Sequence, residues 1–172
     1  MKDHMRIGFG YDAHALVVGR PLILGGVSIP SECGLAGHSD ADVVVHALCD
    51  AMLGSLALGD SGQHFPSSDE RWRGVSSLSL LQHVTRLLRE QYYVLGNADV
   101  TIVAQKPRLM PYIGQMSQIV ATTIGVNMEQ VSIKATTTDG LGFVGQGQGI
   151  AAYAICLTLH QPPNHFVGDT CR

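Results

Sequence analysis

Residues 131–159 read VSIKATTTDGLGFVGQGQGIAAYAICLTL, and the order of patterns in this stretch decides the fold class. The β-branched residues of 131–138 predict a strand. The glycine-rich residues 140–149 predict a turn, and the apolar residues 150–159 predict a last strand. The turn contains G-x-G-x-x-G, a motif that must open a helix in dinucleotide-binding proteins. Because a strand is predicted after it, the pattern argues against a dinucleotide-binding fold.

The rest of the chain mixes strands and helices without strict alternation. In chain order, the residue pattern predicts a strand over 5–12, a strand pair or hairpin arm over 21–29 and a helix from 39–40 to about 58. It then predicts a loop over 60–75, a helix over 77–92, a strand over 97–105 and a helix ending near 124. Ser39 or Asp40 is the expected N-cap of the first helix. The loop is long for a compact domain, which is typical of a functional or mobile segment. We therefore expect an α+β fold, a single domain over 1–172, with a mixed β-sheet and helices packed on one face.

Composition excludes several classes of protein. The 172 residues include 11 basic and 14 acidic side chains, so the chain lacks the basic excess of a general nucleic-acid binder. No apolar run approaches the roughly 18 residues of a membrane helix. The N-terminus has no long apolar signal-peptide core, so we expect a cytoplasmic protein, or one of an organelle stroma if a targeting segment was removed. Charged residues are only 15% of the chain, which weakly favours an oligomer that hides surface.

The four cysteines do not predict a metal site. Cys33, Cys49, Cys156 and Cys171 form no C-x-x-C pair. We expect reduced thiols, with Cys49 and Cys156 acting as small hydrophobic residues in apolar surroundings.

Two histidines and a carboxylate form a candidate metal site. Asp12 and His14 lie two residues apart on a predicted strand, so both side chains point to one face. His46 lies on the first predicted helix, and Asp50, one turn later, is a candidate acceptor for its other ring N–H. Two imidazoles and one carboxylate match the catalytic zinc pattern, in which a fourth position stays open. Spacing alone leaves open that His46 is a hydrogen-bonded core residue.

The end of the strand before the glycine-rich turn carries a second candidate. Thr136, Thr137 and Thr138 precede Asp139. These residues either end a strand and begin a turn, or donate hydroxyls to phosphate while Asp139 holds a hard cation such as Mg²⁺. His38, near a predicted helix N-terminus, either binds an anion or caps the helix.

Four segments are more specific together than any motif alone. They are RIGFGYDAH at 6–14, GHSDADVVVHALCDAMLGSLALGDSG at 37–62, NADVTIVAQKPRLMPYI at 97–113 and IKATTTDGLGF at 133–143. In this order and spacing they closely resemble the 2-C-methyl-D-erythritol 2,4-cyclodiphosphate synthase family of the non-mevalonate isoprenoid pathway. The resemblance covers about 5–159, which we take as the core, and leaves 160–172 as an irregular tail.

The resemblance implies a reaction and an assembly. Members of the family convert 4-diphosphocytidyl-2-C-methyl-D-erythritol 2-phosphate to the cyclic diphosphate and CMP. The 2-phosphate attacks the β-phosphorus within one substrate molecule. Family members are homotrimers with active sites between adjacent subunits, and their sheets line a central β-prism.

The resemblance also implies two cations and two phosphate contacts. One Zn²⁺ per active site would be held at Asp12, His14 and His46. A second divalent cation, Mg²⁺ or Mn²⁺, would be held at Asp139. His38 and Thr137 match the catalytic pair that contacts the transferring phosphates.

Substrate contacts follow from the same resemblance. The cytidine contacts correspond to Ala104, Gln105, Lys106, Pro107, Arg108, Leu109, Met110 and Ala135. The ribose and erythritol contacts correspond to Asp60, Ser61, Gly62, Phe65, Pro66, Ser67, Ser68 and Asp69. The remaining expected substrate contacts are Ser39, Thr136, Thr138, Phe143 and Gln146.

Three positions depart from the family pattern. The family usually has Glu where this chain has Asp139, often Asp where it has Ser67, and often Arg where it has Gln146. A neutral amide cannot pair with a diphosphate as a guanidinium does, so we expect weak binding of isoprenoid diphosphates near Gln146.

Two other functions remain as alternatives. A catalytically weak cytidine-nucleotide-binding homologue would bind CMP without turning the substrate over. A zinc hydrolase would need a general base beside the metal-bound water, and it would leave the cytidine and phosphate motifs unexplained.

Overall fold

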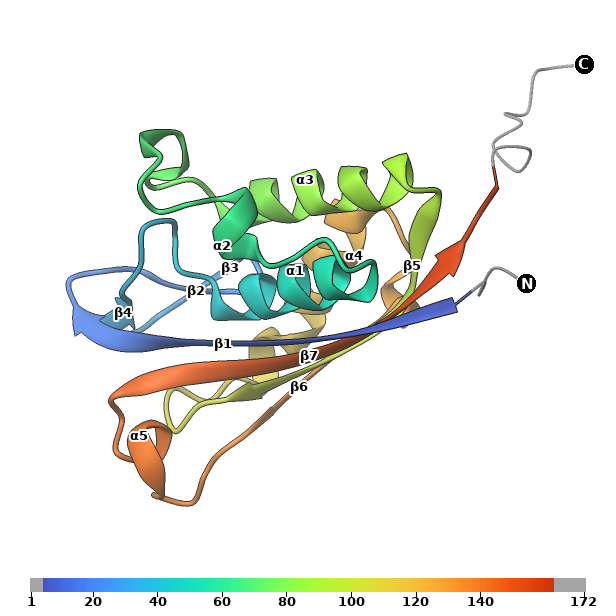
Figure 1. The fold of residues 1–172 in the computed structure, drawn as a ribbon. Coiled ribbons are helices and arrows are strands. Elements are labelled where there is room, and N and C mark those ends of the chain that lie inside the picture. The colour runs from blue at the N-terminus through green and yellow to red at the C-terminus, as the bar shows by residue number, and fades with distance from the viewer. Residues whose placement is uncertain (1–4, 163–172) are drawn as a thin grey trace, which may run out of the picture.

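The computed structural model describes residues 5–162, which form one five-stranded mixed sheet with the order β4-β1-β7-β5-β6 (Figure 1). The strands are β1 (Met5–Val18), β4 (Cys33–Leu35), β5 (Tyr93–Val103), β6 (Val131–Thr136) and β7 (Gly149–His160). Neighbouring strands are antiparallel except β5 and β6, which are parallel. A separate hairpin pairs β2 (Leu22–Leu24) with β3 (Val27–Ile29). The predicted α+β class and mixed sheet are confirmed.

The helices that form the core lie on one face of this sheet. They are α1 (Val43–Ser55), α3 (Ser77–Glu90) and α4 (Ile113–Ile124). Helix α1 lies directly on β1 and β7, and α3 packs on α1 and α4 (Figure 1). Two one-turn helices, α2 (Ser61–His64) and α5 (Gly142–Gly145), lie in connecting segments, together with 3₁₀ turns at Glu70–Trp72, Met110–Tyr112 and Met128–Gln130. Among the described residues, no helix has the length and apolar character needed to cross a membrane.

Two glycines allow α1 to lie unusually close to β1. A Cβ atom added at Gly8 would lie 1.8 Å from the Ala51 carbonyl oxygen, and one at Gly10 would lie 2.0 Å from that of Ala47. Such distances are far inside van der Waals contact, so only glycine fits at these two positions. The glycine cluster near the N-terminus therefore serves helix–sheet packing.

The first helix begins later than predicted. Ser39 and Asp40 are not its N-cap; Asp42 is, with its carboxylate accepting from Val44 N and Val45 N. The carboxylate is fully buried and also accepts from the backbone N–H groups of the β2–β3 turn, Gly25 at 2.9 Å and Gly26 at 2.7 Å. These long-range bonds select Asp42 as the cap, and sequence spacing does not reveal them.

Other boundaries move by a few residues. Helix α1 ends at Ser55 rather than near 58, and β1 continues to Val18. The predicted loop over 60–75 contains α2 and a 3₁₀ turn, and the predicted turn over 140–149 contains α5. The strand predicted after this turn is confirmed as β7, so G-x-G-x-x-G does not open a long helix. Cys49 and Cys156 are buried free thiols, as predicted; Cys171 and the tail from 163 lie outside the described residues.

The opposite face of the sheet carries exposed apolar side chains on its two longest strands. We call this set the outer-face patch: Met5, Ile7, Phe9 and Tyr11 on β1, and Tyr153 and Ile155 on β7. Ile7 is 74% exposed and Phe9 is 60% exposed. A contiguous apolar patch of this kind is typical of a surface that another protein covers.

The contact between α1 and β1 can be tested with one added methyl group. Gly10→Ala should lower the free energy of unfolding by about 3 kcal/mol, because the methyl group meets helix backbone that cannot rotate away. Gly114→Ala is the matched control: this glycine lies in α4, and an added Cβ would meet nothing within 4 Å. The control should stabilise the protein by up to about 1 kcal/mol. Urea unfolding of both variants measures the difference, and equal stabilities would contradict the packing argument.

Candidate active site

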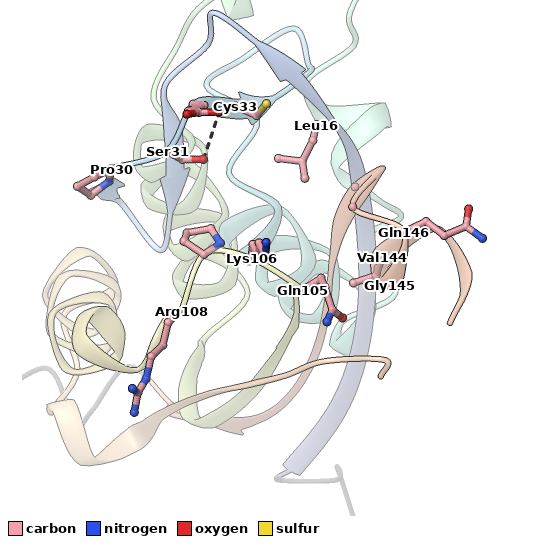
Figure 2. A pocket seen from close by; sticks show the side chains of 14 residues that line it. Leu16, Pro30, Ser31, Cys33, Gln105, Lys106, Arg108, Val144, Gly145 and Gln146 are labelled. Atoms are coloured by element: carbon pink, nitrogen blue, oxygen red, sulfur yellow. Dashed lines mark hydrogen bonds between the residues drawn. The ribbon is translucent and has the colours of Figure 1, made fainter. Parts of the chain in front are cut away.

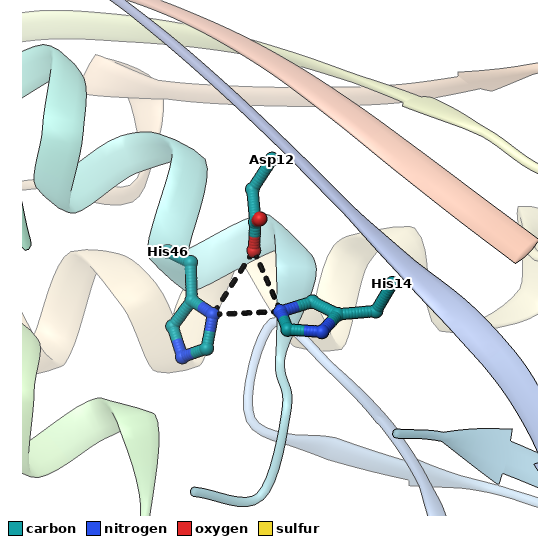
Figure 3. A group of neighbouring side chains, drawn as sticks. All are labelled: Asp12, His14 and His46. Atoms are coloured by element: carbon teal, nitrogen blue, oxygen red, sulfur yellow. Dashed lines mark hydrogen bonds and ion pairs between the residues drawn. The ribbon is translucent and has the colours of Figure 1, made fainter. Parts of the chain in front are cut away.

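Asp12, His14 and His46 meet where β1 passes under the start of α1 (Figure 3). The Oδ2 atom of Asp12 lies 2.9 Å from Nε2 of His14 and 3.0 Å from Nδ1 of His46. The two ring nitrogens lie 3.2 Å apart. One oxygen and two nitrogens from different parts of the chain therefore point at a common centre, as Asp12, His14 and His46 were predicted to do.

The remaining polar atoms of the triad are held from outside. Nδ1 of His14 donates to the carbonyl oxygen of Ala36 at 2.6 Å, so in the neutral ring Nε2, which faces the centre, is the nitrogen that can bind a metal ion. Oδ1 of Asp12 accepts from the backbone N–H of Ala13. Each side chain is thus oriented by a hydrogen bond on the side away from the centre, as metal ligands usually are.

The electrostatics of the triad favour a cation. Burial raises the pKa of Asp12, but hydrogen bonds with His14 and His46 together hold that pKa well below its usual value. The hydrogen bond with Asp12 raises the pKa of His14, against the effect of desolvation. The carboxylate therefore attracts positive charge, and a metal ion would replace protons on the imidazoles. Two nitrogen donors and one oxygen donor fit a divalent metal with an open coordination position.

The partner predicted for the other nitrogen of His46 was wrong. Asp50 accepts from the backbone N–H of Ser61 at 2.7 Å, so it supports α2 rather than the triad. Nε2 of His46 instead lies 2.9 Å from Oγ of Ser77 and 3.1 Å from Oγ of Ser39. Ser77 begins α3, and its role follows only from the tertiary contact.

A cavity of about 250 Å³ opens beside the triad. Its lining includes six residues predicted as catalytic or substrate contacts: His38, Ser39, Ser61, Gly62, Phe65 and Ser67. Trp72 and Leu80 also line it, and neither was predicted, because an aromatic and an aliphatic residue in a loop and a helix carry no motif. Nε2 of His38 and Nε1 of Trp72 are buried and have no hydrogen-bond partner within residues 5–162.

Other residues of this segment that were predicted to contact ribose or erythritol instead bond to neighbours within the segment. Asp60 caps α2 by accepting from Gln63, and Asp69 forms an ion pair with Arg71. Asp60, Pro66, Ser68 and Asp69 belong to the segment over the cavity but are not among its lining residues in the described part of the chain.

The predicted cytidine segment surrounds a different cavity. This second cavity, of about 840 Å³, is lined by 104–110, 133–137, Ile113 and Gly114. It lies where β5 and β6 end, so the parallel pairing brings Ala104 beside Thr136. At its edge, Oγ1 of the lining residue Thr137 donates to Oδ1 of Asp139 at 3.1 Å. Within residues 5–162, none of the segment 104–110 lines the cavity beside the triad.

A third cavity lies on the other side of the 105–108 loop (Figure 2). Gln105 and Lys106 line it together with Leu16 and the α5 segment that carries Gln146. Figure 2 shows the Gln146 side chain extending away from Lys106. Two other predicted contacts near α5 lie apart from this cavity: Phe143 is 42% exposed, and Thr138 donates to the Leu141 carbonyl.

Comparison with known proteins identifies the family. A sequence profile of the YgbB family matches residues 5–159, so the chain belongs to the YgbB family. The curated relative from Alkaliphilus metalliredigens is 60% identical over 151 residues, covers 88% of this chain and 95% of its own length, and is named 2-C-methyl-D-erythritol 2,4-cyclodiphosphate synthase. The family predicted from the four sequence segments is therefore confirmed.

Solved structures with the same fold agree with this assignment. The bifunctional IspDF from Campylobacter jejuni has a TM-score of 0.88 and 36% identity over 91% of this chain, which spans 42% of the longer IspDF chain. The CDP complex of IspF from Plasmodium falciparum has a TM-score of 0.82 and 29% identity, covering 94% of this chain and 100% of that one.

Metal titration tests the triad directly. Calorimetry on metal-stripped protein should give one tight Zn²⁺ site per chain. His14→Ala should weaken Zn²⁺ binding by more than about 100-fold, because removing a direct ligand lowers metal affinity more than removing a residue that only hydrogen-bonds to a ligand. His83→Ala is the matched control, since this histidine lies on α3 outside the triad. Equal Zn²⁺ affinity in the two variants would show that the triad is not the metal site.

Proposed function

We propose that this protein is a metal-dependent phosphorus–oxygen lyase that converts 4-diphosphocytidyl-2-C-methyl-D-erythritol 2-phosphate to 2-C-methyl-D-erythritol 2,4-cyclodiphosphate and CMP. The observation that carries the proposal is the Asp12, His14 and His46 triad beside a cavity, in a chain 60% identical to a synthase of that name. The product is an intermediate of isoprenoid biosynthesis.

The proposed reaction needs no nucleophile from the protein. An oxygen of the substrate's 2-phosphate forms a bond to the β-phosphorus, and the bond from that phosphorus to the bridging oxygen of CMP breaks. CMP leaves with the electron pair of the broken bond. Since both reacting groups belong to one molecule, the main tasks of the protein are to fold the substrate and to offset the repulsion between two anions.

We infer two cations in this site. One Zn²⁺ per active site, held by Asp12, His14 and His46, fits the nitrogen and oxygen donors of the triad. Asp139, whose carboxylate lies beside the Thr137 hydroxyl, offers the oxygen ligands that Mg²⁺ or Mn²⁺ prefers. When bound, such cations supply Lewis-acid stabilisation of phosphoryl oxygens.

His38 and Thr137 are the residues we assign to the transferring phosphates. The buried, unpartnered Nε2 of His38 beside the triad supports a role as a phosphate hydrogen-bond partner. Thr137 lines the second cavity, and its hydroxyl, which donates to Asp139, would turn to donate to a diphosphate oxygen when substrate binds. Both residues would orient the phosphates and spread their charge.

The second cavity is the proposed cytidine site. Its support is the segment 104–110 with Ala135, together with the CDP complex of the Plasmodium falciparum relative. Backbone N–H and C=O groups of a loop can read the edge of a pyrimidine. Ser61, Gly62, Phe65 and Ser67 would contact the ribose and erythritol portions beside the triad.

We propose that three copies of the chain assemble with active sites between adjacent subunits. The triad cavity and the cytidine cavity form on different elements of one chain, so a substrate that uses both can be held between copies. The outer-face patch offers the apolar surface for a central β-prism formed by three sheets.

Product analysis tests the reaction. With substrate, Zn²⁺ and Mg²⁺, ³¹P NMR should reveal cyclic diphosphate and CMP; His46→Ala should lower the rate by at least about 100-fold, while His83→Ala should stay near the original rate. CMP binding without turnover would instead favour the cytidine-nucleotide-binding homologue. Linear hydrolysis products would favour a zinc hydrolase.

Light scattering after size exclusion tests the assembly. Ile7→Asp places a charge in the centre of the outer-face patch and should convert the trimer to monomer, because an unpaired buried charge is costly. Val18→Asp is the matched control, since this 83% exposed residue lies on the same strand outside the patch. A trimer in both variants would contradict this interface.

A further inference from the structure

His46 is linked to a carboxylate through a single buried hydroxyl. Oγ of Ser77 lies 2.9 Å from Nε2 of His46 and is also hydrogen-bonded to Oδ1 of Asp40. The Ser77 backbone N–H donates to the other oxygen of Asp40 at 2.9 Å. Ser77 has no exposed surface, so water does not compete for its hydroxyl. His46, Ser77 and Asp40 therefore form one continuous chain of hydrogen bonds.

The chemistry of the groups fixes the direction of these bonds. A carboxylate only accepts, so the Ser77 hydroxyl must donate to Asp40. The oxygen of Ser77 is then left as an acceptor for His46, whose Nε2 must carry the proton. In the neutral ring, Nδ1 of His46 is then the unprotonated nitrogen, and it is this atom that faces Asp12 and His14.

We propose that Asp40 and Ser77 are positioning residues that select the tautomer and the ring orientation of His46, and thereby set the metal affinity of the triad. This inference rests on the metal site of the proposed function. His14 needs no such device, because the backbone carbonyl of Ala36 already selects its tautomer. Ser39 supplies a second, weaker acceptor for His46, since its Oγ is 3.1 Å from Nε2 and also accepts from the N–H of Ala41.

Backbone hydrogen bonds around His46, Ser77 and Asp40 hold these residues in place. The N–H of Asp40 donates to the carbonyl of Val75 at 3.2 Å, and the N–H of Gly74 donates to the carbonyl of His38 at 2.9 Å. The segment 38–40 is thereby fixed to the segment that leads into α3. Asp40 and Ser77 thus connect α3 to His46 while His38, held by the same pairing, lines the adjacent cavity.

Asp40→Asn is the most informative variant, because it keeps the shape but changes the direction of the hydrogen bonds. An amide can donate to Ser77, and the Ser77 hydroxyl can then donate to His46. Donation to Nε2 moves the ring proton to Nδ1, the atom that a metal needs. Ser77→Ala removes the hydroxyl and leaves only Ser39 as an acceptor. Ser79→Ala is the matched control, because Ser79 is an exposed residue of the same helix.

Two measurements on metal-stripped protein test the proposal without catalysis. Nitrogen-15 NMR of the neutral His46 ring should show the Nε2–H tautomer in the original protein and in Ser79→Ala. Asp40→Asn should increase the Nδ1–H form. Calorimetric Zn²⁺ affinity should fall by about 10- to 100-fold in Asp40→Asn and Ser77→Ala, and stay unchanged in Ser79→Ala.

The outcomes separate this inference from the proposed function. An unchanged His46 tautomer and unchanged Zn²⁺ affinity in a folded Asp40→Asn protein would overturn the positioning role, whether or not Ser77→Ala folds. Zn²⁺ affinity that falls without a tautomer change would also overturn tautomer selection. If the original protein bound no Zn²⁺, the proposed metal site would fail, while the NMR comparison would still report the tautomer of His46.

Discussion

The close approach of α1 to β1 is the constraint on which the site depends. Gly8 and Gly10 remove the side chains that would otherwise hold the helix away from the strand. His46 on the helix can then reach Asp12 and His14 on the strand, with ligand atoms about 3 Å apart. A wider separation would leave a carboxylate with one imidazole, which is a poor set of ligands for a metal. Helix packing and metal geometry therefore follow from the same two glycines.

The start of α1 is the second determinant of the site. Because Asp42 caps the helix and accepts hydrogen bonds from the β2–β3 turn, residues 39–41 remain outside the helix. Ala41 adopts a positive φ of 58°, which turns this short segment back toward α3. Ser39 can therefore contact His46, and Asp40 can contact Ser77, instead of forming a helical turn. A helix beginning at 39, as spacing predicted, would remove this support.

The two cavities assigned to the proposed reaction lie on different parts of one chain. The triad and its cavity lie between β1, the first turn of α1 and the segment 61–72, whereas the 104–110 segment forms a cavity at the ends of β5 and β6. The apolar outer-face patch lies on the opposite side of the sheet from the helices that form the core. This separation of the two cavities is compatible with the proposed active site between copies of the chain.

The sequence by itself determined the fold class, most of the strands and helices, the triad and its family, because these depend on local periodicity, strand alternation and motif order. Asp12 and His14 share a face through a spacing of two residues, and the four segments lead to His46. Only the tertiary structure decided the bonds from Asp42 to the β2–β3 turn, the role of Asp50 in supporting α2, and the contacts of Ser77 with His46 and Asp40. These bonds join residues that are 11 to 37 positions apart. Local spacing carries no information about such pairs, because the packing of α1, α3 and the β2–β3 turn selects them.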